Sequence, residues 1–228
     1  MAVKRLMQAD LIKALDVLTE TVDSNEVRIK HLNELICDNL PYDTKKVFLD
    51  GIVKYENLSV LASKVSDVFL MLLDIYTYGT YAMLSKDEWD WRAFARHLYT
   101  MLYEHSKTIN RQLNDIVKVL KADIDKNYDL SSLVQAKRKF SALIAENSKF
   151  AKQIRVNVDA HFDGDFTKRL SLIKNLSYSS VTALYFDYNC KMHDFLSTLK
   201  PALERLRLSA DASYHTLIAF SIHNSKME

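Results

Sequence analysis

The sequence predicts an all-α protein, built as an up-and-down bundle of long antiparallel helices. Glycine and proline are scarce, at 3 and 2 of 228 residues, whereas a sheet protein of this length needs many turn residues. Hydrophobic residues, 48% of the chain, recur at spacings of three and four, which is the helical period. The 10 Phe and 12 Tyr supply enough apolar surface for a large core. With no repeat and no low-complexity linker, residues 1–228 are expected to form one domain.

The first forty residues carry two apolar series at helical spacing. They are Leu11, Leu15, Leu18 and Val22, and then Ile29, Leu32 and Ile36. Between them, Asp23-Ser24-Asn25 either caps a second helix or is a polar turn of one long helix. The first alternative makes residues 1–40 an N-terminal helical hairpin, the one separable part of the chain. Leu40-Pro41 ends the segment, because a residue before proline disfavours the α region.

A short helix is expected over residues 44–53, weakened by Gly51, and the most hydrophobic helix follows it. One broad stripe of this second helix holds Leu58, Leu61, Val65, Val68, Phe69, Leu72, Tyr76 and Gly79, so we expect a central element with neighbours on several sides. Tyr76, Tyr78 and Tyr81 are either platforms for stacking bases or core and interface residues. The second alternative is favoured, because no Lys or Arg is interleaved with them.

Ser85 and Glu88 have the spacing of a capping box, which opens a long helix running to about Ala122. Arg92, Arg96 and His97 form a donor-rich cluster near its start. The cluster is either a solvated face with snorkelling arginines or a part of a functional site, and the first interpretation is favoured.

The second half of the chain continues in the same way. A polar connector over residues 123–129 precedes a helix from about Leu130 to Ala160, which Asp163-Gly164-Asp165 interrupts. Asp165 can cap a short helix reaching Ile173, and Ser177 can start the last long helix. Pro201 is expected to kink or restart that helix, and the tail beyond Ser209 to dock as a separate short helix.

Charge and cysteine content exclude several classes of protein. The net charge of +2 gives no field over the whole molecule for nucleic acid or anionic lipid, although a local patch remains compatible with it. Cys37 and Cys190 have neither metal-type spacing nor a disulfide framework, which favours a reduced, cytoplasmic setting. No membrane span is expected, because Asp74 inside the most apolar stretch would cost roughly 2.5–3.5 kcal/mol in a bilayer.

The familiar catalytic motifs are absent. The sequence has no glycine-rich phosphate loop, no HExxH, no CxxC, no GxSxG and no Glu-x-x-His pair of the di-iron bundles. Asp159, His161 and Asp163 alternate along the chain, and alternate positions on a helix point to different faces. No metal site and no cofactor is therefore predicted.

Arg155 and His161, six residues apart near the end of a long helix, are the residues left for chemistry. On an unbroken helix six steps put them about 120° apart, so they do not aim at one point. In a structural interpretation, His161 is partly buried against Asn147 or a carbonyl, and Arg155 pairs with Asp159 at the surface.

A functional interpretation needs one of two geometries. The helix ends near Asp159 and swings His161 towards Arg155, or a two-fold dimer brings two copies of the segment face to face. Either cleft suits RNA cleavage, because a neutral histidine can take the 2′-hydroxyl proton and an arginine can stabilise phosphate charge without a metal.

The segment from Ile154 to Asp163, late in a long helix and followed by Lys168-Arg169-Leu170, resembles the Arg-x(4–6)-His segment of the HEPN superfamily, in particular its abortive-infection and toxin-like prokaryotic branches. The resemblance covers residues 130–200. It implies an all-α homodimer that acts as a metal-independent RNase or RNA-binding module in a defence or toxin–antitoxin system, with RNA and an antitoxin or other protein as partners.

By the same resemblance, Arg155 and His161 are the catalytic pair, and Asn157, Asp159 and Lys152 are candidate substrate-binding residues. Val156 stands where family members usually carry a polar residue, with Asn157 one place later. Two alternatives stay open: a non-catalytic helical module for protein interaction, and a small-ligand binder that uses the Tyr- and Trp-rich central helices.

Overall fold

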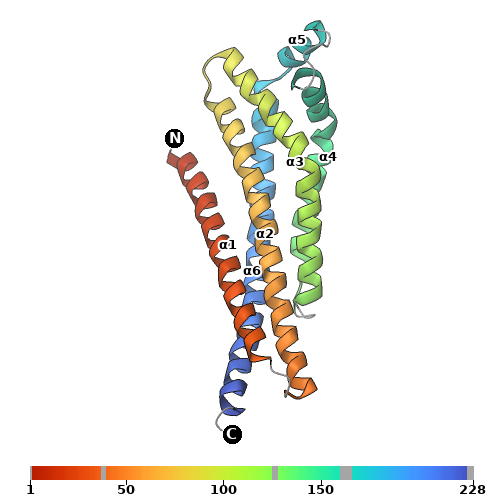
Figure 1. Ribbon diagram of the computed structural model, residues 1–228. Helices are drawn as coiled ribbons and strands as arrows, with labels where there is room; N and C mark the ends of the chain where they lie inside the picture. Colours follow the sequence, from red (N-terminus) through yellow and green to blue (C-terminus); the bar gives the residue numbers. More distant parts are fainter. Residues whose placement is uncertain (1, 37–39, 125–127, 160–165, 225–228) are drawn as a thin grey trace.

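The protein is an elongated bundle of helices, as predicted (Figure 1). The computed structural model describes residues 2–36, 40–124, 128–159 and 166–224, apart from the side chains of residues 2–8, 10, 158, 159, 166, 168 and 220–224. Within those ranges there are six α-helices, one π-helical turn and no strand. The helices are α1 (Ala2–Leu35), α2 (Tyr42–Leu84), α3 (Glu88–Asp123), α4 (Ser131–Ile154), α5 (Phe166–Lys174) and α6 (Tyr178–Asn224), and the π-turn η1 (Arg155–Asp159) extends α4.

The two longest helices, α2 and α6, each belong to two bundles, one formed with α3 and α4 and the other with α1. With α3 and α4 they form a four-helix bundle in which successive helices alternate in direction (Figure 1). Towards the C-terminal end of α6, α1 packs beside α2 and makes a three-helix bundle. Helix α2 has 43 residues and α6 has 47, so each is roughly 65–70 Å long. Both are longer than α1, α3 or α4, and each therefore belongs to the bundle with α1 over one part of its length and to the bundle with α3 and α4 over another.

Residues 2–35 form one continuous helix, so of the two alternatives for residues 1–40 the one long helix is confirmed and the hairpin is wrong. The chain turns back only after α1, and the hairpin consists of α1 and α2. Asn25 does not cap a second helix: it is buried, and its amide donates to Ser59 Oγ of α2 at 3.2 Å. This bond explains the continuity, because a polar residue within an apolar stripe can be buried once it has a partner.

Gly51 and Gly79 mark two places where α6 approaches α2 closely. A Cβ on Gly51 would lie 3.1 Å from Leu217 Cδ1 and 3.6 Å from Leu32 Cδ1, so three helices meet there. A Cβ on Gly79 would lie 2.2 Å from the Tyr185 ring. The separate short helix expected over residues 44–53 is therefore wrong, because α2 runs through Gly51 without a break.

Polar residues of α2 pair with α3 in an antiparallel register. His105 Nε2 lies 3.1 Å from Asp74 Oδ2, Gln112 donates to Asp67, and Lys64 Nζ lies 2.9 Å from Asp115 Oδ2. Each step along α2 is matched by an equal step back along α3, as in an antiparallel helix pair. The charged side chains in and just before the most apolar stretch, Lys64, Asp67 and Asp74, thus face α3. No helix in the described residues is long and apolar enough to cross a membrane.

The boundaries of α3 and α6 correct two further expectations. The N-cap of α3 is Asp87, whose carboxylate accepts from Trp89 and Asp90, while the Ser85 hydroxyl donates back to the Tyr81 carbonyl. No capping box forms there. Helix α6 continues through Pro201 to Asn224, so the tail is not a separate helix. Pro201 is exposed, and water can solvate the carbonyl that its missing N–H leaves unpaired.

The favoured interpretation of the three tyrosines as core or interface residues is confirmed for Tyr76, whereas Tyr81 is 51% exposed. Tyr76 is buried in the core, while Tyr78 lies beside His97 and Tyr81 stacks on Phe94, with ring centroids 5.3 and 5.2 Å apart. Cys190 is exposed and carries a free thiol, whereas Cys37 lies outside the described residues.

Candidate functional site

The segment that carries the predicted residues lies at one end of the four-helix bundle. There the π-turn η1 at the end of α4 packs against α3 and α5 (Figure 1). The π-turn that begins at Arg155 is thus packed between α3 and α5. The site is built from α3, from the end of α4 and from α5.

Arg155 is the first residue of the π-turn. Its backbone N–H still donates to the carbonyls of Ala151 and Lys152, so the helix widens only after this point. Such turns use i→i+5 hydrogen bonds and are frequent at functional sites. The 120° separation of Arg155 and His161 assumed an unbroken α-helix, and the wider turn over Arg155–Asp159 removes that assumption.

The Arg155 guanidinium is held by Glu104 of α3. Its Nε donates to Glu104 Oε1, and both side chains are about one-third to one-half exposed. Among the described residues Glu104 is its hydrogen-bond partner, and this contact leaves Nη1 and Nη2 unengaged there. The side chain of Asp159 lies outside the described residues, so the surface pair expected between Arg155 and Asp159 stays a prediction beside this contact.

Two of the other predicted site residues are visible. The Asn157 amide donates to the Gln153 carbonyl of α4 at 2.9 Å, which uses one of its two N–H groups. Lys152 is exposed one turn before the π-turn. His161 lies outside the described residues, and its distance from Arg155 stays a prediction.

Arg92 has a structural role that the sequence did not suggest. Its Nη1 donates to the carbonyls of Ile173, Lys174 and Leu176, at 2.7, 2.8 and 3.0 Å, and its Nη2 pairs with Glu88. The side chain is only 13% exposed. The predicted snorkelling on a solvated face is therefore wrong for Arg92, because a guanidinium is well suited to satisfy the unpaired carbonyls at a helix C-terminus.

Arg96 and His97 lie next along α3. Arg96 Nη2 is 3.4 Å from His97 Nε2, and the His97 ring lies beside Tyr78. Both are partly buried. Arg92 thus anchors α5 next to the π-turn, whereas His97 faces α2.

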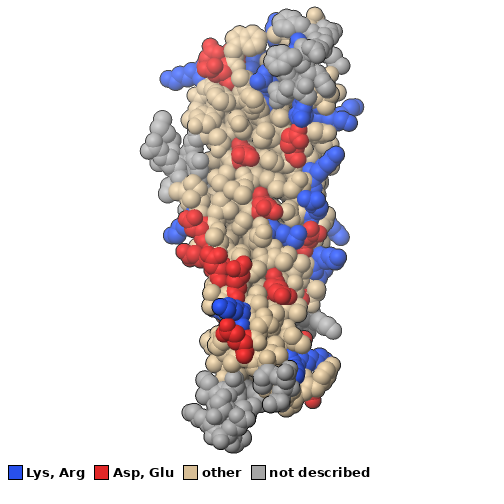
Figure 2. Space-filling model, in the orientation of Figure 1, with Lys and Arg blue, Asp and Glu red and all other residues tan. Residues whose placement is uncertain are grey.

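The exposed face of α4 is strongly basic. The helix has five basic residues and one acidic residue, Glu146, so its charge is +4 in a chain whose net charge is +2. Arg138, Lys139, Lys149 and Lys152 are exposed, and Arg155 follows at the same spacing of three that separates Lys149 from Lys152. Figure 2 shows basic side chains gathered along the edge formed by α3 and α4.

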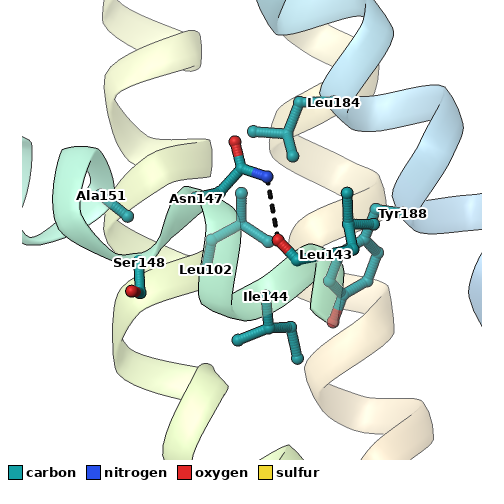
Figure 3. A pocket seen from close by; sticks show the side chains of 8 residues that line it. All are labelled: Leu102, Leu143, Ile144, Asn147, Ser148, Ala151, Leu184 and Tyr188. Carbon is teal, nitrogen blue, oxygen red and sulfur yellow. Dashed lines mark hydrogen bonds between the residues drawn. The ribbon is translucent and has the colours of Figure 1, made fainter. Parts of the chain in front are cut away.

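A small pocket lies just below the π-turn, between α3, α4 and α6 (Figure 3). Its volume of about 10 Å³ admits roughly one water molecule, so it cannot hold a nucleobase. Asn147 lies at its wall and donates to the Leu143 carbonyl. Tyr188 lines it as well; its hydroxyl is buried without a hydrogen-bond partner among the described residues, and burial raises its pKa.

The described residues contain no group of three or more His, Cys, Asp or Glu side chains that could hold a metal ion. What the arrangement offers is cationic: a guanidinium anchored at Nε beside a row of exposed lysines. A guanidinium held in this way can present its two terminal nitrogens to a phosphate as a fork.

Sequence reasoning missed Glu104, because it lies 51 residues from Arg155 and no local pattern joins them. Comparison of the chain with protein-family models, curated proteins and solved structures finds no match.

Proposed function

We propose that the protein is a HEPN-like RNA-binding protein that cleaves RNA without a metal, with Arg155 and His161 as its catalytic pair. The observation that carries the proposal is the basic face of α4, which leads directly into a π-turn beginning at Arg155. RNA affinity rests largely on phosphate contacts with Lys and Arg, and this face concentrates such residues.

In the proposed reaction His161, in its neutral form, takes the proton of a 2′-hydroxyl. The alkoxide attacks the adjacent phosphorus, a 2′,3′-cyclic phosphate is formed, and the 5′-oxygen leaves as a hydroxyl after taking a proton from water. Arg155 stabilises the charge that develops on the phosphate oxygens. Lys152, Asn157 and Asp159 are the proposed residues for binding the strand, and a second copy of the chain completes the cleft.

Glu104 is the proposed positioning residue. By accepting from Nε it fixes the plane of the Arg155 guanidinium, so Nη1 and Nη2 can face a phosphate together. This contact also keeps a negative charge close to the bound RNA. Removal of that charge would therefore strengthen binding even while it weakens catalysis.

The test is cleavage of labelled single-stranded RNA in EDTA by the purified protein and by Arg155→Ala, His161→Ala and Glu104→Gln. We expect each of the first two to lose at least about 100-fold in kcat, the range of one acid–base or charge-stabilising group. Glu104→Gln should lower kcat about tenfold with an equal or lower KM. Glu26→Gln, an exposed carboxylate on α1 and so away from the basic face of α4, is the matched control and should change neither kcat nor KM.

A second function, a non-catalytic module for protein interaction, is favoured by the ion pair itself, because Glu104 gives Arg155 a structural partner. It predicts that no RNA is cleaved under any condition and that His161→Ala lowers Tm. If the folded protein left RNA uncut both in EDTA and in Mg²⁺, the non-catalytic interaction module would be supported instead of the RNase.

A further inference from the structure

A second concave feature lies away from the π-turn site. It is an apolar groove of about 600 Å³ whose described lining residues all belong to α1, α2 and α6. Leu58, Ala62, Val65 and Phe69 of α2 form its floor at helical spacing, and all four are buried. Val17 of α1 and Leu203 of α6 are among the residues of its two walls.

In the described part of the chain, the side-chain hydrogen bonds and ion pairs between α1 and α6 lie at one end of the groove. Arg28 Nη1 lies 3.0 Å from Asp211 Oδ1, and His31 shares a hydrogen bond of 2.7 Å with the Tyr214 hydroxyl. These contacts lie towards the C-terminal ends of both helices. Figure 1 shows the N-terminal half of α1 diverging from the bundle, and the groove lies between this part of α1 and α6, above α2.

The rim of the groove is positively charged. Lys13 of α1 and Lys200 and Arg207 of α6 line it, against one carboxylate, Glu204. All four side chains are exposed. A ligand with an apolar chain and an anionic head group would therefore match the apolar floor with its chain and the basic rim with its head group.

The volume indicates a small molecule in preference to a protein helix. Ligand sites of this kind measure about 300–1,000 Å³ and are mostly apolar with a few polar groups. A helix of three turns, about 10 Å across, would fill about 1,200 Å³. The α6 wall from Leu196 to Arg207 spans about 16 Å, the length of an extended chain of roughly twelve carbons.

We propose that the groove binds a free single-chain fatty acid, with its acyl chain along the α2 floor and its carboxylate at Lys13, Lys200 and Arg207. The proposal is independent of RNA cleavage. Each pair of added methylenes is expected to tighten binding by about tenfold until the groove is full.

The experiment is calorimetric titration of the full chain with dodecanoate below its aggregation concentration, compared with decanoate. We expect one saturable site, with dodecanoate binding about tenfold more tightly. Dodecyltrimethylammonium, which has the same tail with a cationic head, is expected to bind at least tenfold more weakly.

Two variants test the binding of the carboxylate and of the acyl chain separately. Lys200→Glu with Arg207→Glu should weaken dodecanoate at least tenfold and leave Tm unchanged, because both side chains are exposed. Val17→Trp, at a position 53% exposed, should fill the groove and abolish binding of either amphiphile. Lys118→Glu with Lys121→Glu on α3, also exposed, is the charge-matched control and should bind dodecanoate like the parent chain.

Three outcomes would overturn the proposal. One is the absence of saturable binding, or binding that neither variant changes. Another is sedimentation of a dimer that Val17→Trp dissociates, which would make a second copy the occupant. The third is binding only to phosphatidylglycerol vesicles and not to dodecanoate, which would indicate a membrane surface.

Discussion

Gly79 sets how closely α2 and α6 can approach each other. Its missing Cβ leaves the space that the Tyr185 ring occupies, and the Tyr185 hydroxyl shares a buried hydrogen bond with Thr80 at 2.9 Å. The ring is thus held from both ends, so it cannot move aside easily. At this position a side chain would meet a rigid neighbour.

Gly79→Ala is therefore expected to destabilise the protein by about 1–2 kcal/mol, because overpacking outweighs the gain in helix propensity. Gly51→Ala is the matched control, since its Cβ would meet only the flexible ends of Leu217 and Leu32. There the propensity gain of up to about 1 kcal/mol should prevail. Urea denaturation of both variants measures the difference, and equal effects of the two substitutions would contradict this account.

Asp123, the last residue of α3, gives a pH-dependent prediction. Burial raises its pKa, although a hydrogen bond from Asn57 and the charge of Lys54 act in the opposite direction, and one of its oxygens has no hydrogen-bond partner in the described part of the chain. The folded state thus binds this proton more tightly than the unfolded state. The carboxylate destabilises the fold above its raised pKa, and that penalty disappears below the unfolded value of 3.8.

Asp123→Asn should therefore raise Tm at neutral pH, by roughly 2 °C, and give no difference from the parent at about pH 3.5. Thermal unfolding of both chains across this range is the measurement. If Asp123→Asn raised Tm by the same amount at pH 3.5 as at neutral pH, protonation of the Asp123 carboxylate would not explain the effect.

At the scale of the element, Arg92 decides whether α5 is held against the bundle. Its guanidinium satisfies three carbonyls at the end of α5 and the following turn. Arg92→Ala should speed amide exchange within residues 166–174 by roughly 30-fold, for a loss of about 2 kcal/mol in charge-assisted hydrogen bonds.

Hydrogen-exchange mass spectrometry would follow that helix in Arg92→Ala and Arg92→Lys, with Lys86→Ala as an exposed control. The lysine variant should lie in between, since its ammonium keeps the charge and loses the planar fork. If α5 exchanges at the parent rate in the alanine variant, the cap does not hold it.

The helices themselves were largely predictable from the sequence, because the 3.6-residue period of apolar side chains is a local property. Several of the errors concern the continuity of helices, and in each of them a local signal for a break is overridden. Asn25, Gly51 and Pro201 each signal a break, but Asn25 has Ser59 as a partner, Gly51 allows three helices to meet, and Pro201 is exposed. Tertiary contacts outweigh the local preference in the first two cases, and solvent satisfies it in the third.

The candidate site was less predictable. Arg155 could be singled out because it stands in a short recognisable segment, yet its partner Glu104 belongs to another helix, 51 residues away. The π-turn depends on how α4 ends against α3 and α5, and helical periodicity carries no information on that contact. The same limit applies to the groove, whose walls come from the two ends of the chain.

At the scale of the whole molecule, charge and apolar surface are concentrated on different helices. The net charge of +2 conceals a basic α4, with a charge of +4, and an open apolar groove along α1, α2 and α6. The proposed RNA site and the proposed fatty-acid site therefore have separate walls, so each can be disabled without the other.

The most direct test of the central claim uses one RNA oligonucleotide and its fully 2′-O-methylated copy, incubated with the protein in EDTA. Because the proposed attack comes from the 2′-oxygen, only the unmodified strand should be cut, and mass spectrometry should find 2′,3′-cyclic phosphate and 5′-hydroxyl ends. Equal cutting of both strands, or of neither by folded protein, would contradict RNA cleavage by Arg155 and His161.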